Sequence, residues 1–536
     1  EGYPGPAGAA MGHPTSTSST AASPPGQLVA RPTSRGGRQR PGSAPPRPAL
    51  QCHGSGLNFF CQLDGEQSAA SRYSTPSRLE WLEELKPSTI CCGGRFSVAI
   101  SEREGEKGAV FRWGTDNGKV LRAPDKLDLG LPLRAMHVAC GSKHTLILVE
   151  SGHVLSFGIG YFGQLGHGDD VSSGTPRIVQ KLDPQALRGD RVSTVAAGGA
   201  HSGAITRSGM VYCWGFNRSG QTGVATKANT ISEPRECNLV NLQEDQSGAN
   251  GGGDTYAVTG QGGQPPPGPP GKPIVMVCGR HHSAMLTDTG AVFTWGATSF
   301  GRLGLHDQST KNVTKPTRVT TLDHFAVHGL ASGDFHMLAL TRDRRVFSWG
   351  YGAEGQCGHG NSLHLRTPRP VEALRHVLVS KIGCGAWYSA AVSADGYLYT
   401  WGYGDGGWLG QEPPKGGDAP MVEPGPPSAQ KQAETCSFDS AHNNLLPGLV
   451  PALADNQVTE VACGGGHLIA LSITRPPAPV VPNAPTVDPA LIAKVNERYW
   501  TGIMDWEALG LEFGLGLGLV FPRTSNSTPV SHPVSR

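Results

Sequence analysis

The chain has 536 residues, of which 75 are glycine and 43 are proline, both above ordinary usage. Charged residues make up 16 % and the formal net charge is +2, which argues against a protein that binds nucleic acid or membranes by electrostatics alone. The longest apolar stretch near the C-terminus, residues 513–521, is too short for a bilayer, so we expect no membrane span.

The start of the chain and its cysteines bear on the compartment. The chain begins at Glu1 without a basic-then-apolar signal pattern, so we treat it as intracellular, in the cytoplasm or the nucleus. Its 12 cysteines lack the paired short spacings of a zinc site and are too few for a disulfide scaffold. We therefore expect reduced thiols and no metal.

Residues 1–50 are rich in Ser, Pro and Gly and low in apolar residues, which predicts a disordered arm. The arm carries five arginines, Arg31, Arg35, Arg38, Arg40 and Arg47. We favour a solvated linker, with contact to chromatin or nucleic acid as the alternative.

A repeat of about 50 residues follows and decides the fold. Its first half is a short apolar run, a small residue, Gly, two variable residues, usually His, and then alternating apolar residues. Seven copies place this glycine at Gly93, Gly141, Gly198, Gly279, Gly333, Gly385 and Gly464. Six second halves end at Trp113, Phe157, Trp214, Trp295, Trp349 and Trp401, each followed by Gly. Period-two alternation across short turns is typical of β-hairpins.

The missing seventh second half has a candidate at the other end of the chain. Gly54-Ser55-Gly56, followed by Cys61-Gln62-Leu63, is similar to Gly158-Ile159-Gly160, followed by Gly163-Gln164-Leu165. An N-terminal strand paired with the last unit would close a ring and remove exposed sheet edges. We predict an all-β fold, a seven-bladed β-propeller over residues 51–472 closed by an N-terminal strand, with an open solenoid as the alternative.

The compound motif of Gly-x-x-His, Trp-Gly and Gly-Gln-Leu-Gly resembles the repeat of the regulator of chromosome condensation family, whose members form seven-bladed propellers. The resemblance covers roughly residues 54–472. The family includes an exchange factor for the small GTPase Ran, which also binds chromatin, and a plant ultraviolet-B receptor with repeated Gly-Trp-Arg-His-Thr motifs. The receptor's Trp is replaced here by Ser142, Gly199, Arg280, Asp334 and Ala386, which argues against photoreception.

Two of the spacings between consecutive copies of the repeat are longer than the others, and the chain continues beyond the last copy. The inserts at about 245–272 and 411–445 are rich in Gly and Pro and are predicted to be disordered loops. The tail, residues 473–536, is Pro-rich with an amphipathic helix predicted over 489–508. We favour packing of this helix on the propeller, with partner binding as the alternative.

Side chains that recur in one slot of the repeat are expected to be structural. Five copies have a histidine in the same slot, where it would make a repeated hydrogen bond: His144, His201, His282, His336 and His467. The large rings that would fill the gaps between blades are Trp113, Trp214, Trp295, Trp349 and Trp401. The sequence shows no catalytic centre, and we expect no cofactor.

The informative variation lies in the two residues that follow the glycine of each copy, which would gather near one mouth of the central channel. Aromatic and arginine side chains dominate interface energetics, so diverse residues there suggest a recognition surface. The candidate contacts are Arg95, Lys143, Arg280, His281, Asp334, Phe335, Trp387 and Tyr388. Ordinary solvated turns are the alternative.

These observations favour a non-catalytic protein-interaction propeller, a scaffold or regulatory subunit that binds a protein partner through loops at one face. The alternative is a guanine-nucleotide exchange factor for a Ran-like or Rab-like small GTPase. The residues that match the family motif are the structural ones, so no exchange residue is carried over.

Overall fold

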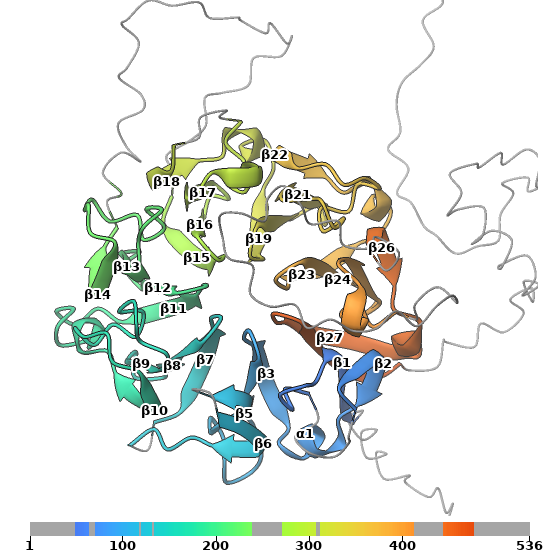
Figure 1. Cartoon of the computed structure of the whole chain (residues 1–536), viewed down its shortest axis with the longest axis horizontal. Helices are drawn as coiled ribbons and strands as arrows, with labels where there is room; N and C mark the ends of the chain where they lie inside the picture. The colour runs from blue at the N-terminus through green and yellow to red at the C-terminus, as the bar shows by residue number, and fades with distance from the viewer. Residues whose placement is uncertain are drawn as a thin grey trace, which may run out of the picture. The chain divides into compact units, whose positions relative to one another are not determined.

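Seven four-stranded antiparallel sheets stand in a ring in the computed structural model of the chain (Figure 1). The structure describes residues 49–63, 70–116, 119–130, 133–237, 239, 271–306, 311–411 and 443–475. The predicted arm, both inserts and the tail with its helix at 489–508 lie wholly or almost wholly outside these residues. Within the described ranges, no helix is long and apolar enough to cross a membrane.

The seven sheets are called blades 1–7 in chain order, and their strands are given from the centre of the ring outward. Blade 1 has β3 (Pro87–Cys92), β4 (Phe96–Ser101), β5 (Val110–Asp116) and β6 (Lys119–Lys126). Blade 2 has β7 (Ala135–Cys140), β8 (His144–Val149), β9 (Val154–Gly158) and β10 (Ser173–Ile178). Blade 3 has β11 (Val192–Ala197), β12 (His201–Thr206), β13 (Val211–Phe216) and β14 (Thr230–Glu236). Blade 4 has β15 (Pro273–Cys278), β16 (His282–Thr287), β17 (Val292–Gly296) and β18 (Val313–Arg318); blade 5 has β19 (Val327–Ser332), β20 (His336–Thr341), β21 (Val346–Gly350) and β22 (Leu365–Pro370); blade 6 has β23 (Val379–Cys384), β24 (Tyr388–Ser393), β25 (Leu398–Gly402) and β26 (Asn444–Leu449). Blade 7 has β27 (Asn456–Cys463), β28 (His467–Thr474), β1 (Leu50–Leu57) and β2 (Arg72–Arg78). The helices are short: α1 (Glu80–Glu84), η1 (Gln180–Leu182), η3 (Ser299–Gly301), η4 (Thr320–Leu322), η5 (Glu372–Leu374), η6 (Asp405–Gly407) and η8 (Pro451–Leu453).

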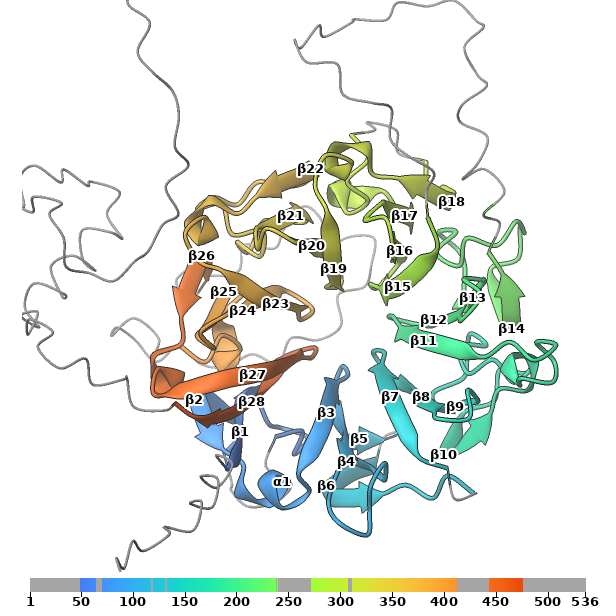
Figure 2. The ribbon, with the colours of Figure 1, turned by 180° about the vertical axis from the view of Figure 1, so that it is seen from behind.

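Blade 7 closes the ring, because it joins strands from both ends of the propeller (Figure 2). β1 pairs with β28 in an antiparallel register from Leu50 opposite Ile473 to Gly56 opposite His467. The predicted closure is confirmed, although two N-terminal strands contribute where one was expected. Gly56 faces His467 as Gly296 faces His282 in blade 4, so Gly56 is the seventh copy of the glycine that lies near the end of each third strand, opposite the start of the second.

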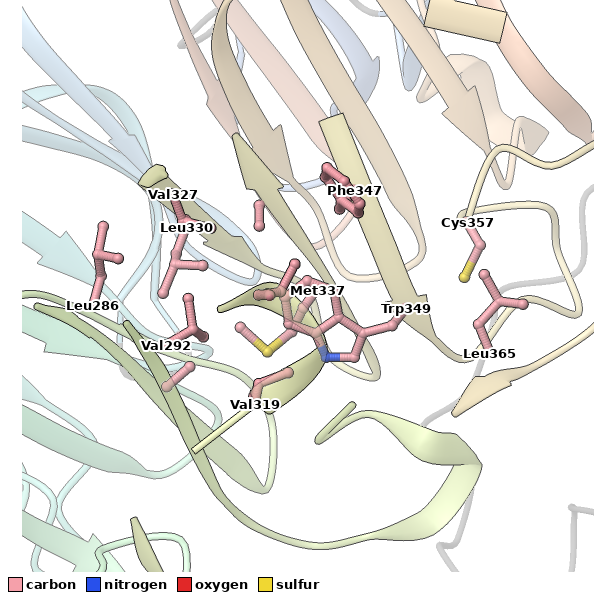
Figure 3. Close-up of a cluster of buried hydrophobic side chains, with 13 residues drawn as sticks. Leu286, Val292, Val319, Val327, Leu330, Met337, Phe347, Trp349, Cys357 and Leu365 are labelled. Atoms are coloured by element: carbon pink, nitrogen blue, oxygen red, sulfur yellow. The ribbon is translucent and has the colours of Figure 1, made fainter. Parts of the chain in front are cut away.

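The apolar core is divided among the seven junctions between neighbouring blades, with one cluster at each. At the junction of blades 4 and 5, Leu286 and Val292 pack toward Leu330, Met337 and Trp349 of the next blade (Figure 3). Alternation along each strand buries one face against the preceding blade and the other against the following one. No blade has a complete core of its own, so the blades stabilise one another.

The tryptophan of each Trp-Gly pair links two blades by a hydrogen bond as well as by packing. All five are fully buried. Their indole Nε1 groups donate to backbone carbonyls of the preceding blade, at Gln62, Gln164, Gln221, Arg302 and Gln356, over 2.8–3.0 Å. We call this accepting position the glutamine slot, because four of these five residues are glutamine.

The repeated histidines lie at the same junctions. His144 Nε2 is 2.8 Å from Ser202 Oγ of the next blade, and Ser202 Oγ donates to Gln164 O. Because the serine hydroxyl has one proton, the histidine must donate from Nε2. The pattern recurs at His201, His336 and His467. His282 bonds Ser332 instead, since Met337 stands where the serine would be.

The ring closure generates a first prediction. Gly56 has a φ of +105°, and a Cβ there would lie 2.5 Å from the backbone oxygen of Gly466. We expect Gly56→Ala to lower the free energy of unfolding by about 3 kcal/mol or more, from strain and this backbone clash. Gly105→Ala is the control, since its φ is +82° but its Cβ would meet nothing within 4 Å. Equal losses for the two variants in thermal unfolding would contradict closure through β1.

The buried histidines generate a second prediction. Burial lowers the pKa of His336 to about 3, and no described residue forms a hydrogen bond with its Nδ1. As the pH falls below about 6.5, this imidazole is therefore protonated in the unfolded chain before it is protonated in the folded chain. Each such histidine lowers the free energy of unfolding by about 1.4 kcal/mol per pH unit in this range. His336→Tyr, which copies Tyr388 in the same slot of blade 6, should remove that part of the slope between pH 6 and 4.

Urea unfolding at several pH values measures this slope. His324→Gln is the control, because His324 is exposed and lies outside the junctions. An unchanged pH slope for His336→Tyr would exclude His336 as a contributor to acid sensitivity.

Candidate protein-interaction surface

One face of the ring is defined by the seven turns that join each inner strand to the second strand: 93–95, 141–143, 198–200, 279–281, 333–335, 385–387 and 464–466. We call it the turn face. Backbone N–H groups of six turns donate to the next turn over 3.0–3.3 Å: Ser142 to Gly198, Gly199 to Gly279, Arg280 to Asp334, Asp334 to Ala386, Ala386 to Gly464 and Gly465 to Gly93. Backbone hydrogen bonds therefore join six of the seven pairs of neighbouring turns.

The repeated glycine is required because neighbouring turns approach closely. A Cβ at Gly141 would lie 2.4 Å from the backbone oxygen of Gly198 and 2.5 Å from the ring of His144. No side chain fits there without moving backbone. The two residues after the glycine vary between copies, and the first of them carries a side chain at Ser142, Arg280, Asp334 and Ala386. In the other three copies this first residue is Gly94, Gly199 or Gly465, where a Cβ would lie 2.5–2.7 Å from a backbone oxygen of the next turn.

The loops that leave each third strand lie on the same face, as the antiparallel register requires. Gly350 at the end of β21 is opposite His336 at the start of β20. The next N–H, of Tyr351, donates to the carbonyl of Phe335 over 2.9 Å. The residue after each Trp-Gly therefore stands beside the variable pair of its own blade.

Five ring side chains from blades 4, 5 and 6 make contact across this face: Phe300, Phe335, Tyr351, His364 and Trp387. We call them the aromatic cluster. Ring centroids are 5.1 Å apart for Phe335 and Trp387, 5.5 Å for Tyr351 and Trp387, and 5.0 Å for Phe300 and Tyr351. Tyr351 stacks on His364 at 4.7 Å. His364 is exposed and the other four rings are half-buried, so the cluster is both packed and accessible.

Charged side chains border the aromatic cluster. Arg280 pairs with Asp334 at 3.3 Å, and its guanidinium lies 5.9 Å from the ring centre of Phe335. Arg302 lies over the rings of Phe335 and Phe300 at 4.7 and 5.6 Å. Burial raises the pKa of Asp334 and lowers the pKa of Arg302 to about 10. Both ionised groups are therefore held partly away from water.

The structure brings together four of the predicted contact residues, Arg280, Asp334, Phe335 and Trp387. His281 faces the other way, toward Phe216 at 5.9 Å. Of the remaining three, Arg95 and Lys143 lie on other blades and Tyr388 is buried.

Arg95 is exposed on blade 1 and packs over the ring of Phe60 at 4.6 Å. Lys143 is exposed on blade 2. Both residues lie on the turn face but outside the aromatic cluster.

The prediction of Tyr388 as a contact residue is wrong. Tyr388 is fully buried and occupies the histidine slot of blade 6, opposite Gly402. Its hydroxyl donates to the carbonyl of His467 over 2.7 Å, which replaces the histidine–serine bond of other junctions. The variable pair of this copy is Ala386 and Trp387, and only Trp387 offers a large side chain to the face.

The sequence reasoning missed Phe300, Arg302, Tyr351 and His364. Tyr351 could have been found, because it follows a Trp-Gly pair, as Phe216 and Tyr403 do. Arg302 could also have been found, since it interrupts the Gly-Gln-Leu-Gly pattern. Phe300 and His364 contact each other at 5.1 Å across two blades, which no local pattern reveals.

Other candidate chemistries have little support in the described part of the chain. No group of three or more His, Cys, Asp or Glu side chains there could hold a metal ion. The eleven cysteines of the described ranges are all free thiols. The basic residues proposed for chromatin contact, Arg31, Arg35, Arg38, Arg40 and Arg47, lie outside the described residues.

Comparison with known proteins shows which repeat this is. A family model described as the regulator of chromosome condensation (RCC1) repeat matches residues 151–205, 289–340, 343–392 and 395–471. A second model of the same repeat matches 137–164, 192–221 and 327–356. The matches cover strands of blades 2 to 7.

Relatives carry this propeller in proteins of different size and name. The chain is 28 % identical over 432 residues to the human E3 ubiquitin-protein ligase HERC2. This match covers 79 % of this chain but only 8 % of the ligase. It is 29 % identical over 354 residues to the ultraviolet-B receptor UVR8 of Arabidopsis thaliana, covering 65 % of this chain and 71 % of the receptor.

A solved structure has the same fold. Prp20p from Saccharomyces cerevisiae matches with a TM-score of 0.61 and 18 % identity, over 85 % of this chain and 96 % of that one. Together with the seven glycine-bounded blades and their Trp-Gly junctions, these matches show that the chain belongs to the regulator of chromosome condensation repeat family of seven-bladed β-propellers.

Proposed function

We propose that this chain is a non-catalytic protein-interaction propeller that binds a protein partner through the aromatic cluster on its turn face. The observation that carries the proposal is the contact of Phe335, Tyr351 and Trp387, half-buried rings from two blades, with Arg280 at their edge. Aromatic and arginine side chains that are already partly desolvated and held by packing are those that dominate binding energy at interfaces.

The rigidity of the turn face supports the same proposal. The turns are tied to one another by backbone hydrogen bonds, and the rings pack on one another. Little conformational entropy is then lost when a partner binds. The relatives also support it, because a ubiquitin ligase and a light receptor share this propeller although their names imply unrelated activities.

The second candidate is guanine-nucleotide exchange on a Ran-like or Rab-like small GTPase. It is favoured by the likeness in fold to Prp20p, whose structure is described with its binding to Gsp1p and histones. Exchange would use the same face to bind a protein, so the two candidates differ in what the partner does after binding. A catalytic role would still require no covalent chemistry from this chain.

Substitution of the aromatic cluster tests the proposed function. We expect Phe335→Ala with Trp387→Ala to weaken partner binding at least tenfold, because two packed anchors are lost, while the ring stays folded. The measurement is quantitative mass spectrometry of proteins retained by immobilised chain from a cell extract, with thermal unfolding as the check on folding. Arg95→Ala with Lys143→Ala, on the same face outside the cluster, is the control and should retain the partners. Equal retention by all three proteins would place the interface elsewhere.

Release of fluorescent GDP separates the two candidates. Catalytic amounts of the chain are added to a panel of purified GTPases that includes Ran and several Rab proteins. An interaction propeller leaves every release rate unchanged. Acceleration of one GTPase, abolished by the Phe335→Ala and Trp387→Ala pair, would replace the proposal with an exchange factor that uses this face.

A further inference from the structure

A buried charge departs from the repeat directly beneath the aromatic cluster. The glutamine slot holds Gln62, Gln164, Gln221 and Gln356 at four junctions but Arg302 at the junction of blades 4 and 5. The glutamine side chain has a defined role: its Oε1 accepts the backbone N–H two residues earlier, at Phe60, Phe162, Ser219 and Glu354. A guanidinium has no acceptor and cannot replace it.

The fold does not need the charge of Arg302. The junction uses the backbone carbonyl of this residue, which accepts from Trp349 Nε1 over 3.0 Å as the carbonyls of the glutamines do. The guanidinium donates from Nε to Ser299 O over 2.9 Å, while Nη1 has no hydrogen-bond partner among the described residues, although Arg302 is only 3 % exposed. Burying a charge with an unsatisfied donor costs stability, so glutamine would serve the junction better.

Among the described residues, the charges around Arg302 do not cancel. Of the described residues, the groups that act electrostatically on it are Asp334, which is attractive, and Arg280, which is repulsive. Asp334 is itself paired with Arg280 at 3.3 Å. Two guanidinium groups thus share one carboxylate beside the rings of Phe300 and Phe335. The side chain of Arg280 is 32 % exposed, so it can take a second acceptor from outside.

We propose that this part of the turn face is a binding site for a carboxylate: an Asp or Glu side chain of a partner peptide that also places an aromatic or aliphatic residue on the aromatic cluster. This inference rests on the proposed function and names the chemistry of its partner. Arg280 binds the carboxylate directly, and the buried positive charge of Arg302 beneath the aromatic cluster adds electrostatic attraction. Arginine suits this role because its planar fork stays charged and matches a carboxylate geometrically.

The apolar half of the site follows from the same geometry. Phe335 contacts both Arg280 and Trp387, so a residue next to the bound acid meets ring surface within one side-chain length. A basic segment of a partner would be repelled by the like charges of Arg280 and Arg302. The rings of Phe300 and Phe335 already have cation–π contacts with these two guanidinium groups. The site therefore discriminates by charge as well as by shape.

Selection from a random library tests the ligand class without knowledge of the partner. A phage-displayed library of random 16-residue peptides is selected on the full chain. We expect enriched peptides to carry Asp or Glu next to Phe, Trp, Tyr or Leu. Enrichment of basic peptides, or of peptides without an acid, or no enrichment at all, overturns the proposal.

Binding of the strongest peptide, synthesised with a fluorophore and measured by anisotropy, then tests the residues. Arg280→Gln should weaken binding about tenfold, as expected for one charge-assisted contact. Arg302→Gln restores the residue of the repeat, so it should fold at least as stably and yet bind several-fold more weakly. Asp334→Asn removes the competing carboxylate and should strengthen binding several-fold. Arg95→Gln, an exposed arginine outside the cluster, is the matched control and should have no effect.

The opposite signs expected for Arg280→Gln and Asp334→Asn separate a binding site from a structural ion pair, whose two partners would weaken binding alike. If Trp387→Ala abolishes binding while all three charge variants are neutral, the carboxylate site is excluded and the proposed function stands. If none of these variants, Trp387→Ala included, changes binding, both proposals fall.

Discussion

The backbone carbonyl of the glutamine slot is the acceptor on which the ring depends. At the junction of blades 2 and 3, the carbonyl of Gln164 accepts from Trp214 Nε1 and from Ser202 Oγ, each at 2.8 Å, and that serine is bonded in turn to His144. These donors are fully buried, and a buried donor without an acceptor costs more than an ordinary hydrogen bond contributes. The contact therefore fixes the offset and angle between two blades, while the apolar cluster beside it supplies most of the stabilisation.

The same constraint prepares the turn face for recognition. Once the junctions fix the inner strands, neighbouring turns come so close that only glycine fits where Gly141 and Gly198 meet. The positions that follow are then held by backbone hydrogen bonds that do not depend on their side chains. Arg280 and Asp334 can stand in equivalent positions of neighbouring turns because the backbone, and not the side chain, defines the turn. The repeated backbone thus permits side chains of opposite charge at Arg280 and Asp334.

The sequence predicts the features that recur in every blade, but it does not predict contacts between side chains of different blades. Seven glycines, five Trp-Gly pairs and one Phe-Gly pair predict the blade number, and Gly54-Ser55-Gly56 predicts the closure, because both follow from local spacing. The second N-terminal strand, Arg72–Arg78, lacks alternation and contains a proline, so periodicity does not reveal it. Spacing also fails at Tyr388, where a different side chain fills the histidine slot and resembles part of the variable pair. The cluster around Phe335 joins residues up to 87 positions apart, from Phe300 to Trp387, and only the ring places them together.

Residues that depart from the repeat can indicate where this chain binds a ligand, whereas the repeated residues indicate only the fold. The complete set of tryptophan, serine and histidine contacts occurs at the glutamines Gln62, Gln164, Gln221 and Gln356. The junction at Arg302 keeps the tryptophan bond but has lost the serine, and it lies under the aromatic cluster. A closed ring distributes its stability over seven interfaces, so one junction can bury an uncancelled charge without unfolding the rest. A residue that weakens its own junction and places its charge beside half-buried aromatic side chains of the turn face is better explained by a ligand than by the fold.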